Sequence, residues 1–205
     1  MTTDDLSGEP PRIATAYPIR TAVTDDLARN RATVFFRLIL AIPHLVWLWL
    51  WGLAAGVLWL VNWIWTLIAG RSPDWAHSFY TSFLRYTVHA SSYVSLAAEP
   101  FPAFLGDPGY PVDVQVGPPE YQRRVITGFR IILVIPMLIV ASVLQYVQVA
   151  VAIIAWFYCL FVGRMHEAMR NIITFCIAFN ARTNGYAYFL TDRYPPFSEN
   201  AFPTS

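Results

Sequence analysis

Few side chains in this 205-residue chain have types and spacings that could carry out chemistry. The four histidines stand at 44, 77, 89 and 166 and the two cysteines at 159 and 176. A histidine pair on membrane-spanning helices could hold a haem or a metal ion. In the internal repeat described below, however, Met137 takes the place of His44, and His77 and His89 lie too far apart on one expected helix to share an ion. No CxxC motif accompanies the cysteines. We therefore predict no metal site and no cofactor.

Carboxylates occur at matching places in the two halves of the chain, Asp74 with Glu167 and Glu99 with Asp192. Such pairs could act as general acids and bases or relay protons. Alternatively, the first pair begins two helices and the second pair meets solvent or arginine. The GxSxG, HExxH, P-loop and dinucleotide-binding patterns are absent from the sequence. The sequence therefore favours the structural interpretation and a non-enzymatic protein over an enzyme.

The overall composition is that of a membrane protein. Hydrophobic residues make up 56% of the chain and charged residues 13%, against about 25% charged residues in a typical soluble domain. Aromatic residues reach 16%, with eight Trp, which suits a boundary between lipid and water. The formal net charge is +1, so a nucleic-acid partner is not expected.

An apolar run occurs twice, over residues 36–71 and 129–164, at an offset of 93 residues and without a gap. Each copy opens with Phe-Arg, carries a proline inside and closes with Gly-Arg. The matching positions are Arg37, Pro43, Gly70 and Arg71 in the first copy and Arg130, Pro136, Gly163 and Arg164 in the second. Apolar residues match easily by chance, but these residue types do not. The sequence thus indicates a tandem duplication.

Each run is too long to cross a bilayer once as a straight helix. Residues 33–69 would form a helix of more than about 50 Å, against a hydrocarbon core of about 30 Å. One interpretation is a helical hairpin that turns near residues 52–56. The other is a kink at Pro43, after which a single helix spans the membrane. In the second copy Gln145 and Gln148 stand at the place of this turn, and a polar pair suits the tip of a hairpin. The sequence therefore favours two hairpins, which together contain four short transmembrane helices.

Arginine clusters flank both runs, at 29, 31, 37 and 71 and at 123, 124, 130, 164 and 170. Because positive charge marks the cytoplasmic side of a membrane, we predict a multi-pass membrane protein. Both termini and the segment 99–123 are expected in the cytoplasm. Arg37 and Arg130 are expected to snorkel to the interface beside bends at Pro43 and Pro136. Repeats of this kind would be related by an axis along the membrane normal.

Short strands are predicted before each run, at 17–23 and 110–116, and an amphipathic helix after it. In the first repeat Ser72-Pro73-Asp74 begins a helix that runs to about residue 98. Basic residues form a stripe on each helix: His77, Arg85 and His89 in the first repeat, Arg170 and Arg182 in the second. We predict that these helices lie in the membrane interface and that the stripes contact anionic lipid headgroups. Alternatively, the stripes pair with Glu99, Asp192 or a partner protein.

The predicted organisation is a disordered tail over 1–16, membrane repeats over 17–104 and 110–197, a linker over 105–109 and a tail over 198–205. The residues Ala41-Ile42-Pro43-His44, the Gly-Arg pairs and the segment YFLTDRYPPF at 188–197 resemble an uncharacterised family of actinobacterial membrane proteins, domain of unknown function 4389. The resemblance covers both repeats and implies a bacterial inner-membrane protein. It implies no activity, substrate or catalytic residue.

The predicted fold is an all-α membrane protein of two tandem repeats, each a transmembrane hairpin and an interfacial helix, with short strands at the cytoplasmic face. Three classes of function remain. The first is an accessory or structural subunit of a larger membrane complex, which the apolar, Trp-rich runs favour. The second is a protein that binds or handles anionic lipids, and the third is a membrane enzyme of unknown reaction.

Overall fold

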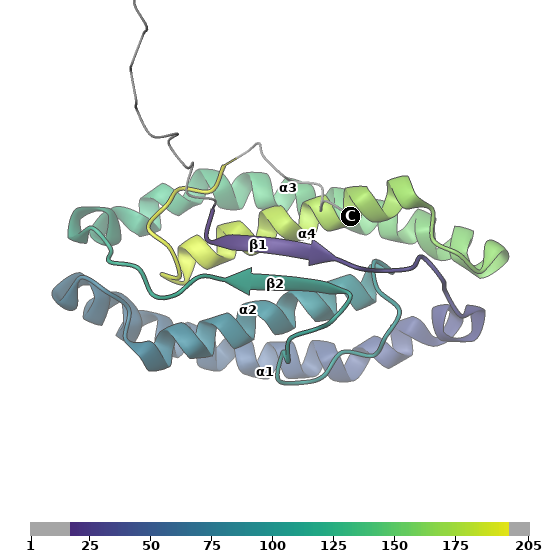
Figure 1. Ribbon diagram of the computed structural model, residues 1–205, viewed down its shortest axis with the longest axis horizontal. Helices are drawn as coiled ribbons and strands as arrows, with labels where there is room; N and C mark the ends of the chain where they lie inside the picture. The colour runs from purple at the N-terminus through teal and green to yellow at the C-terminus, as the bar shows by residue number, and fades with distance from the viewer. Residues whose placement is uncertain (1–16, 197–205) are drawn as a thin grey trace, which may run out of the picture.

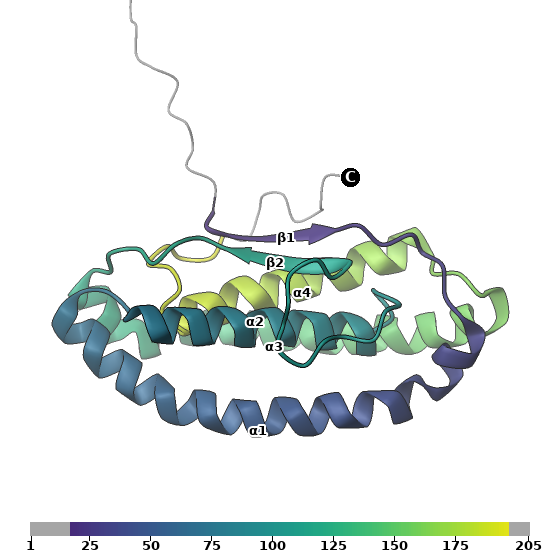
Figure 2. The same cartoon turned by 60° about the horizontal axis from the view of Figure 1, so that its bottom comes forward.

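The computed structural model describes residues 17–196 and arranges them in three layers (Figure 1). In chain order the elements are β1 (Ile19–Val23), α1 (Arg31–Ala69), α2 (Asp74–Val94), β2 (Val112–Val116), α3 (Arg124–Val162) and α4 (Glu167–Ala187). The long helices α1 and α3 form the first layer, α2 and α4 the second, and the strands the third (Figures 1 and 2). Each repeat therefore supplies one strand, one long helix and one short helix.

The strand register shows that the repeats are related by a two-fold axis. The strands are antiparallel, and Thr21 pairs with Val114, its own equivalent 93 residues later. Ile19 pairs with Val116, the equivalent of Val23. Exchanging the two repeats leaves this pairing unchanged, so the axis passes through the central Thr21–Val114 pair. Equivalent helices must then run antiparallel, as α1 and α3 do in Figure 1.

The two repeats are interleaved rather than placed side by side. β1 of the first repeat packs on α4 of the second, and β2 of the second packs on α2 of the first. The Arg29 N–H donates to the Gly163 carbonyl over 3.1 Å, and the Gln122 N–H donates to the Gly70 carbonyl over 2.8 Å. Both glycines end their long helices in the left-handed conformation that favours glycine. Each repeat thus depends on the other to cover its helices.

The predicted hairpins are wrong, because α1 and α3 each continue as a single helix of 39 residues. Pro43 and Pro136 lie inside these helices and end neither of them. Gly52 and Gly56 have open space where a Cβ would stand, so they sit on the outside of α1 without turning the chain. The helix accommodates its length by bowing (Figure 2), since an apolar run keeps its backbone hydrogen bonds better by curving than by breaking.

The strands are confirmed, and α2 begins at Asp74 as predicted but ends at Val94. Ser72 does not cap this helix, because its hydroxyl donates to the Asn62 side chain over 2.8 Å. The predicted position of α2 and α4 in the membrane interface stays a prediction. α2 and α4 lie inside the molecule, between the strands and the long helices (Figure 2), because the interleaved sheet covers the face that carries their polar stripes. The predicted tails over 1–16 and 198–205 lie outside the described residues.

Candidate functional site

The largest chemical feature is a continuous apolar face formed by the outward sides of α1 and α3. In the most apolar 18-residue stretch of each helix, only 17% of α1 and 28% of α3 is buried inside the molecule. Both helices are long and apolar enough to cross a membrane, and a core helix of a soluble protein would be mostly covered. Exposed side chains on this face include Leu38, Leu45, Trp49, Leu53, Val57, Trp65 and Ile68 from α1 and Ile132, Ile139, Val143, Ile153, Ile154, Phe157 and Phe161 from α3.

A groove of about 500 Å³ opens between the long helices, over α2. Its walls are apolar side chains of both long helices, among them Leu45 and Leu48 of α1 and Ala152 and Trp156 of α3. Leu38, Leu45, Val149 and Ile153 line it and are also exposed on the apolar face. The groove is therefore continuous with that face.

Gln148 of α3 lies on the polar side of the groove and is 3% exposed. The Gln148 amide Nε2 donates to the Ser91 Oγ over 2.9 Å and to the Ser95 Oγ over 3.3 Å. The Gln148 Oε1 has no hydrogen-bond partner within residues 17–196. A buried carbonyl oxygen without a partner is uncommon in proteins, so Gln148 brings an unsatisfied acceptor next to the groove.

A smaller chamber of about 70 Å³ adjoins the groove and shares Thr87, Ser91 and Gln145 with it. Asn180 and Asn184 of α4 also line this chamber. Asn180 is the equivalent of Thr87, and Asn184 of Ser91, so the chamber lies on the two-fold axis where α2 and α4 meet. It provides neutral hydrogen-bonding groups next to an apolar groove.

Two buried arginines close equivalent corners of the molecule. The Arg37 guanidinium donates to the carbonyls of Tyr93 and Ala98 and to the Glu99 carboxylate over 2.7 Å, and it lies over the Tyr93 ring. Arg37 is 1% exposed. The prediction that this side chain snorkels to the membrane interface is therefore wrong, because the last turn of α2 and the segment that follows it provide these partners.

Arg130 repeats this arrangement in the second half. Its guanidinium donates to the carbonyls of Tyr186 and Thr191 and to the Asp192 carboxylate over 3.3 Å. It is fully buried, so it does not snorkel either. Glu99 and Asp192 thus have the arginine partners that the sequence offered as one alternative.

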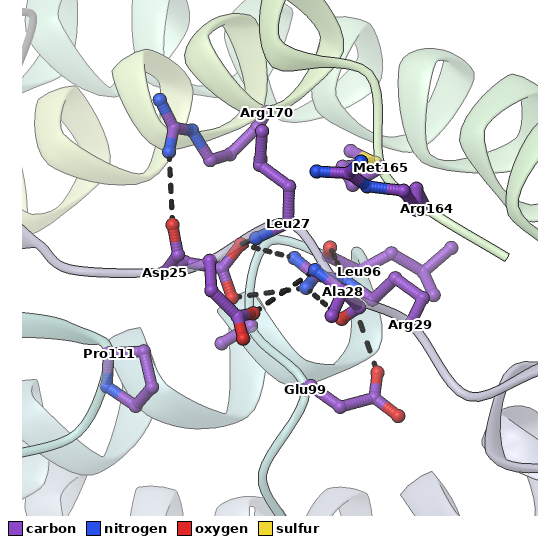
Figure 3. Close-up of polar contacts among 12 residues, drawn as sticks. Asp25, Leu27, Ala28, Arg29, Leu96, Glu99, Pro111, Arg164, Met165 and Arg170 are labelled. Atoms are coloured by element: carbon purple, nitrogen blue, oxygen red, sulfur yellow. Dashed lines mark hydrogen bonds and ion pairs between the residues drawn. The ribbon is translucent and has the colours of Figure 1, made fainter.

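A further charged cluster joins the two repeats (Figure 3), and it shares Glu99 with Arg37. The Arg29 side chain, which is fully buried, meets the Asp25 carboxylate at 2.6 Å and donates to the Leu96 carbonyl over 3.0 Å. From the other repeat, the Arg170 guanidinium donates to the Asp25 carbonyl over 3.3 Å. In the second half Gln122 takes the place of Arg29 and donates to the equivalent carbonyl, that of Phe189. Arg29 and its neutral equivalent Gln122 both donate to the carbonyl of the second residue after the short helix. Because a charge is not needed for this contact, we assign Arg29 a structural role.

Most of the basic stripe of α2 faces the sheet. The His89 Nε2 lies 3.0 Å from the Asp113 carboxylate of β2, and the Arg85 Nε lies 3.4 Å from it. Burial raises the pKa of Asp113, but hydrogen bonds from His89 and from the backbone N–H groups of Gly109 and Val114 outweigh it and lower the pKa below its usual value. Burial also lowers the pKa of His77.

The stripe of α4 lies on the same side of the molecule. Arg170 lies 3.8 Å from the Glu167 carboxylate, and Arg182 is 7% exposed, with its guanidinium 6.0 Å from the centre of the Tyr17 ring. Burial lowers the pKa of Arg182. These contacts hold the stripes against protein groups, away from the apolar face. Contact with anionic headgroups stays a prediction.

The remaining candidates have local roles. The exposed Arg71 reaches the Asp74 carboxylate at 3.3 Å. Arg164 is exposed and its backbone bridges to Ala28. Cys159 and Cys176 are buried free thiols, and within residues 17–196 no three metal-ligating side chains gather.

The family model described as a domain of unknown function (DUF4389) matches residues 31–106 and again residues 124–199. The chain belongs to this family. The two matches confirm the tandem repeat and cover both sets of long and short helices. Neither the search of curated proteins nor the search of solved structures gave a match, so no activity comes to this chain from a relative.

Sequence reasoning missed the groove, although its signals were present. Gln148 is an amide inside an apolar run, and Ala152 stands where the first repeat has Trp59. We interpreted the amide as part of a hairpin tip, and the missing indole has meaning only once α1 and α3 are known to lie against each other.

Proposed function

We propose that the protein is embedded in one leaflet of a membrane, with α1 and α3 in the membrane plane and the sheet toward the aqueous side. In this orientation the exposed apolar side chains of the long helices contact lipid, and the bowed layer displaces part of the leaflet. The observation that carries the proposal is the segregation of the molecule into an apolar helical face and an opposite face made of short strands.

The alternative of a lengthwise crossing places the wrong groups in the lipid. The two-fold axis relates the halves of each layer, so the Thr21–Val114 pair is level with the middle of the long helices. The exposed Arg20 and Gln115, next to this pair, would then lie near the bilayer centre, where an arginine costs about 3 kcal/mol on insertion scales. The sheet edges would also face lipid, and open edges do not occur there.

The in-plane orientation also suits the chain ends that the structure describes. Both ends of the coloured ribbon lie on the sheet side (Figure 2), and the Tyr17 hydroxyl donates to the Arg193 carbonyl over 3.3 Å. Both ends would then face the cytoplasm, and the two-fold axis would stand along the membrane normal. The protein would not cross the membrane, in contrast to a multi-pass arrangement.

Site-directed labelling tests the orientation. Single cysteines replace Asp26 and Asp74, which flank the two ends of α1, while the buried Cys159 and Cys176 remain. In inside-out vesicles a membrane-impermeant maleimide is expected to label both positions, and in intact spheroplasts neither. A lengthwise crossing would expose one position in each preparation, which would overturn the proposal.

Vesicle flotation tests which face is embedded. Replacing the outward Val57 and Ile154 together by Glu is expected to release most of the protein from vesicles, because both side chains are exposed on the apolar face. Replacing Gln115 on the sheet by Glu is the matched control and is expected to leave flotation unchanged. If the sheet variant is released instead, the orientation is inverted.

A second candidate is an accessory subunit of a larger membrane complex. It is favoured by the exposed tryptophans Trp47, Trp49 and Trp65 on the apolar face, because aromatic side chains are enriched at protein interfaces. Brominated lipids separate the candidates. Strong quenching of tryptophan fluorescence in native membranes means that lipid covers the face, and its absence, with a co-purifying membrane protein, means that a partner does.

A further inference from the structure

We infer that the groove between α1, α2 and α3 binds a neutral, hydroxyl-bearing lipid, with the chain against the apolar walls and the hydroxyl hydrogen-bonded to the Gln148 Oε1. This inference rests on the proposed membrane-embedded orientation, since the ligand enters from the leaflet. It gives that orientation a specific ligand, which immersion of an apolar face alone does not require.

The position and size of the groove favour a lipid chain. Its rim is formed by Leu38, Leu45 and Ile153, which are more than half exposed on the apolar face. A chain already in the leaflet reaches the groove without crossing water. The volume of about 500 Å³ is within the range of roughly 300–1,000 Å³ that is typical of ligand pockets.

The orphan oxygen of Gln148 specifies the head of the ligand. Both serine hydroxyls near Gln148 already accept from its Nε2, and the Ser95 Oγ donates to the Ser91 carbonyl over 2.5 Å. The Oε1 therefore lacks a donor among the described residues. A group that donates one hydrogen bond satisfies it, and a hydroxyl is the simplest such group on a membrane lipid.

The surroundings of Gln148 exclude a charged head. Of the described residues, those that line the groove and the adjoining chamber are all uncharged. An ionised phosphate or carboxylate placed there would lose its water without meeting an opposite charge. Asn180, Asn184 and Thr87 of the chamber offer further neutral hydrogen bonds to a second polar group of the lipid.

In the first repeat, side chains fill the place that is equivalent to the groove. Trp59, the equivalent of Ala152, stacks on Trp63 with ring centroids 6.3 Å apart and lies 5.6 Å from the Phe189 ring. Its indole N–H donates to the Ala187 carbonyl over 2.9 Å. Phe189 is the equivalent of Leu96, which lines the groove. An indole at position 152 is therefore a substitution that this fold already accommodates.

Native mass spectrometry of the purified full chain in detergent tests the inference, with oleyl alcohol as the probe. Wild type is expected to bind one molecule. Ala152→Trp is expected to weaken binding at least tenfold, and the matched control Val143→Trp, which adds the same indole on the outward face, is expected to bind as wild type does. Leu96→Phe provides a smaller filling variant, and thermal unfolding checks that each variant folds.

Gln148→Leu tests the hydrogen bond separately from the volume. It is expected to weaken binding of oleyl alcohol by roughly 3- to 10-fold and to leave binding of oleyl methyl ether, which has no hydroxyl, unchanged. Oleate is expected to bind more weakly than the alcohol. The inference is wrong if folded Ala152→Trp and Leu96→Phe both bind as wild type does, or if Gln148→Leu weakens the alcohol and the ether equally.

Flotation of the same variants separates the two proposals. If wild type floats with vesicles but binds no oleyl alcohol, the groove inference fails and the membrane orientation stands. If wild type does not float, the membrane proposal fails first. Filling the groove should leave flotation unchanged, because the apolar face remains intact.

Discussion

The two halves of the α1–α3 interface are equivalent by sequence and differ in what lies between the helices. At both ends an indole N–H closes the interface: Trp63 donates to the Thr127 carbonyl over 3.0 Å, and Trp156 donates to the Val34 carbonyl over 2.8 Å. Between these closures one half holds Trp59 and the other is open beside Ala152. The shared contacts maintain the fold, and the difference produces a cavity. In a duplicated fold, side chains can thus fill the interface in one half while the equivalent place in the other half stays open to a ligand.

The buried arginines are the strongest shared feature, and the comparison predicts similar losses when either is removed. Arg37→Met removes the guanidinium that donates to Glu99 Oε2 and to the Tyr93 and Ala98 carbonyls, although Glu99 still accepts from Asn30 and Thr33. Breaking a buried pair of this kind costs about 4 kcal/mol. Arg130→Met is expected to cost about the same. Unfolding in detergent micelles measures both. Arg71→Met is the control, because its pair with Asp74 is exposed and contributes about 0.3 kcal/mol.

A large difference between the two arginine variants would break the comparison. The Glu99 carboxylate is 2.7 Å from Arg37 and 4.0 Å from Arg29, and the Asp192 carboxylate is 3.3 Å from Arg130 and 3.7 Å from the exposed Arg123. If Arg130→Met were as mild as the exposed control, the second corner would not be an equivalent anchor.

Removing the Trp59 side chain from the filled half of the α1–α3 interface is a second test of the comparison. Trp59→Ala removes a half-buried indole and its hydrogen bond to Ala187 and is expected to lower the free energy of unfolding by about 3 kcal/mol. The same variant is expected to bind a second molecule of oleyl alcohol, because it creates a counterpart of the groove. It lacks a counterpart of Gln148, since Ala55 stands there, so this second site should not distinguish the alcohol from its methyl ether.

The glycines that end the long helices give a smaller and graded effect. Both have a φ near +75°, and an added Cβ would stand 2.8 Å from the Tyr121 ring at Gly70 but 3.2 Å from the Arg31 side chain at Gly163. An L-residue in this conformation costs roughly 1–2 kcal/mol. We expect Gly70→Ala to destabilise more than Gly163→Ala in thermal unfolding, and the reverse order would show that Tyr121 moves away freely.

The two ends of the sheet differ in charge, and pH reveals the difference. Asp113 meets Arg85 and His89, whereas its equivalent in β1 is Arg20. The pKa of Asp113 is lowered in the folded state, so its contribution is present above the unfolded pKa of about 3.9 and is lost as the pH falls through the folded value. Asp113→Asn is expected to cost about 1 kcal/mol at pH 7 and nothing below the folded pKa. An equal cost at pH 7 and pH 2.5 would contradict this.

Local patterns were enough to locate the elements. The coincidence of Gly70 with Gly163 revealed the duplication, and the alternation around Val114 revealed a strand. The residues Ser72-Pro73-Asp74 predicted the start of α2 at Asp74. The arrangement of these elements was harder to predict. A run such as 33–69 has the same composition whether it turns, spans or lies flat, because hydropathy records the environment of side chains and not the direction of the helix.

The sequence by itself determined that the chain is duplicated, that its long helices are apolar on a scale that suits lipid, and that Glu99 and Asp192 have arginine available as a partner. Only the tertiary structure decided which arginine that is, which side of the molecule the basic stripes face, and that Ala152 leaves a groove beside Gln148. These depend on contacts between residues far apart in the chain. The interleaved strands determine the contacts: by pairing about the axis at Thr21 and Val114, they bring the repeats together in one antiparallel arrangement.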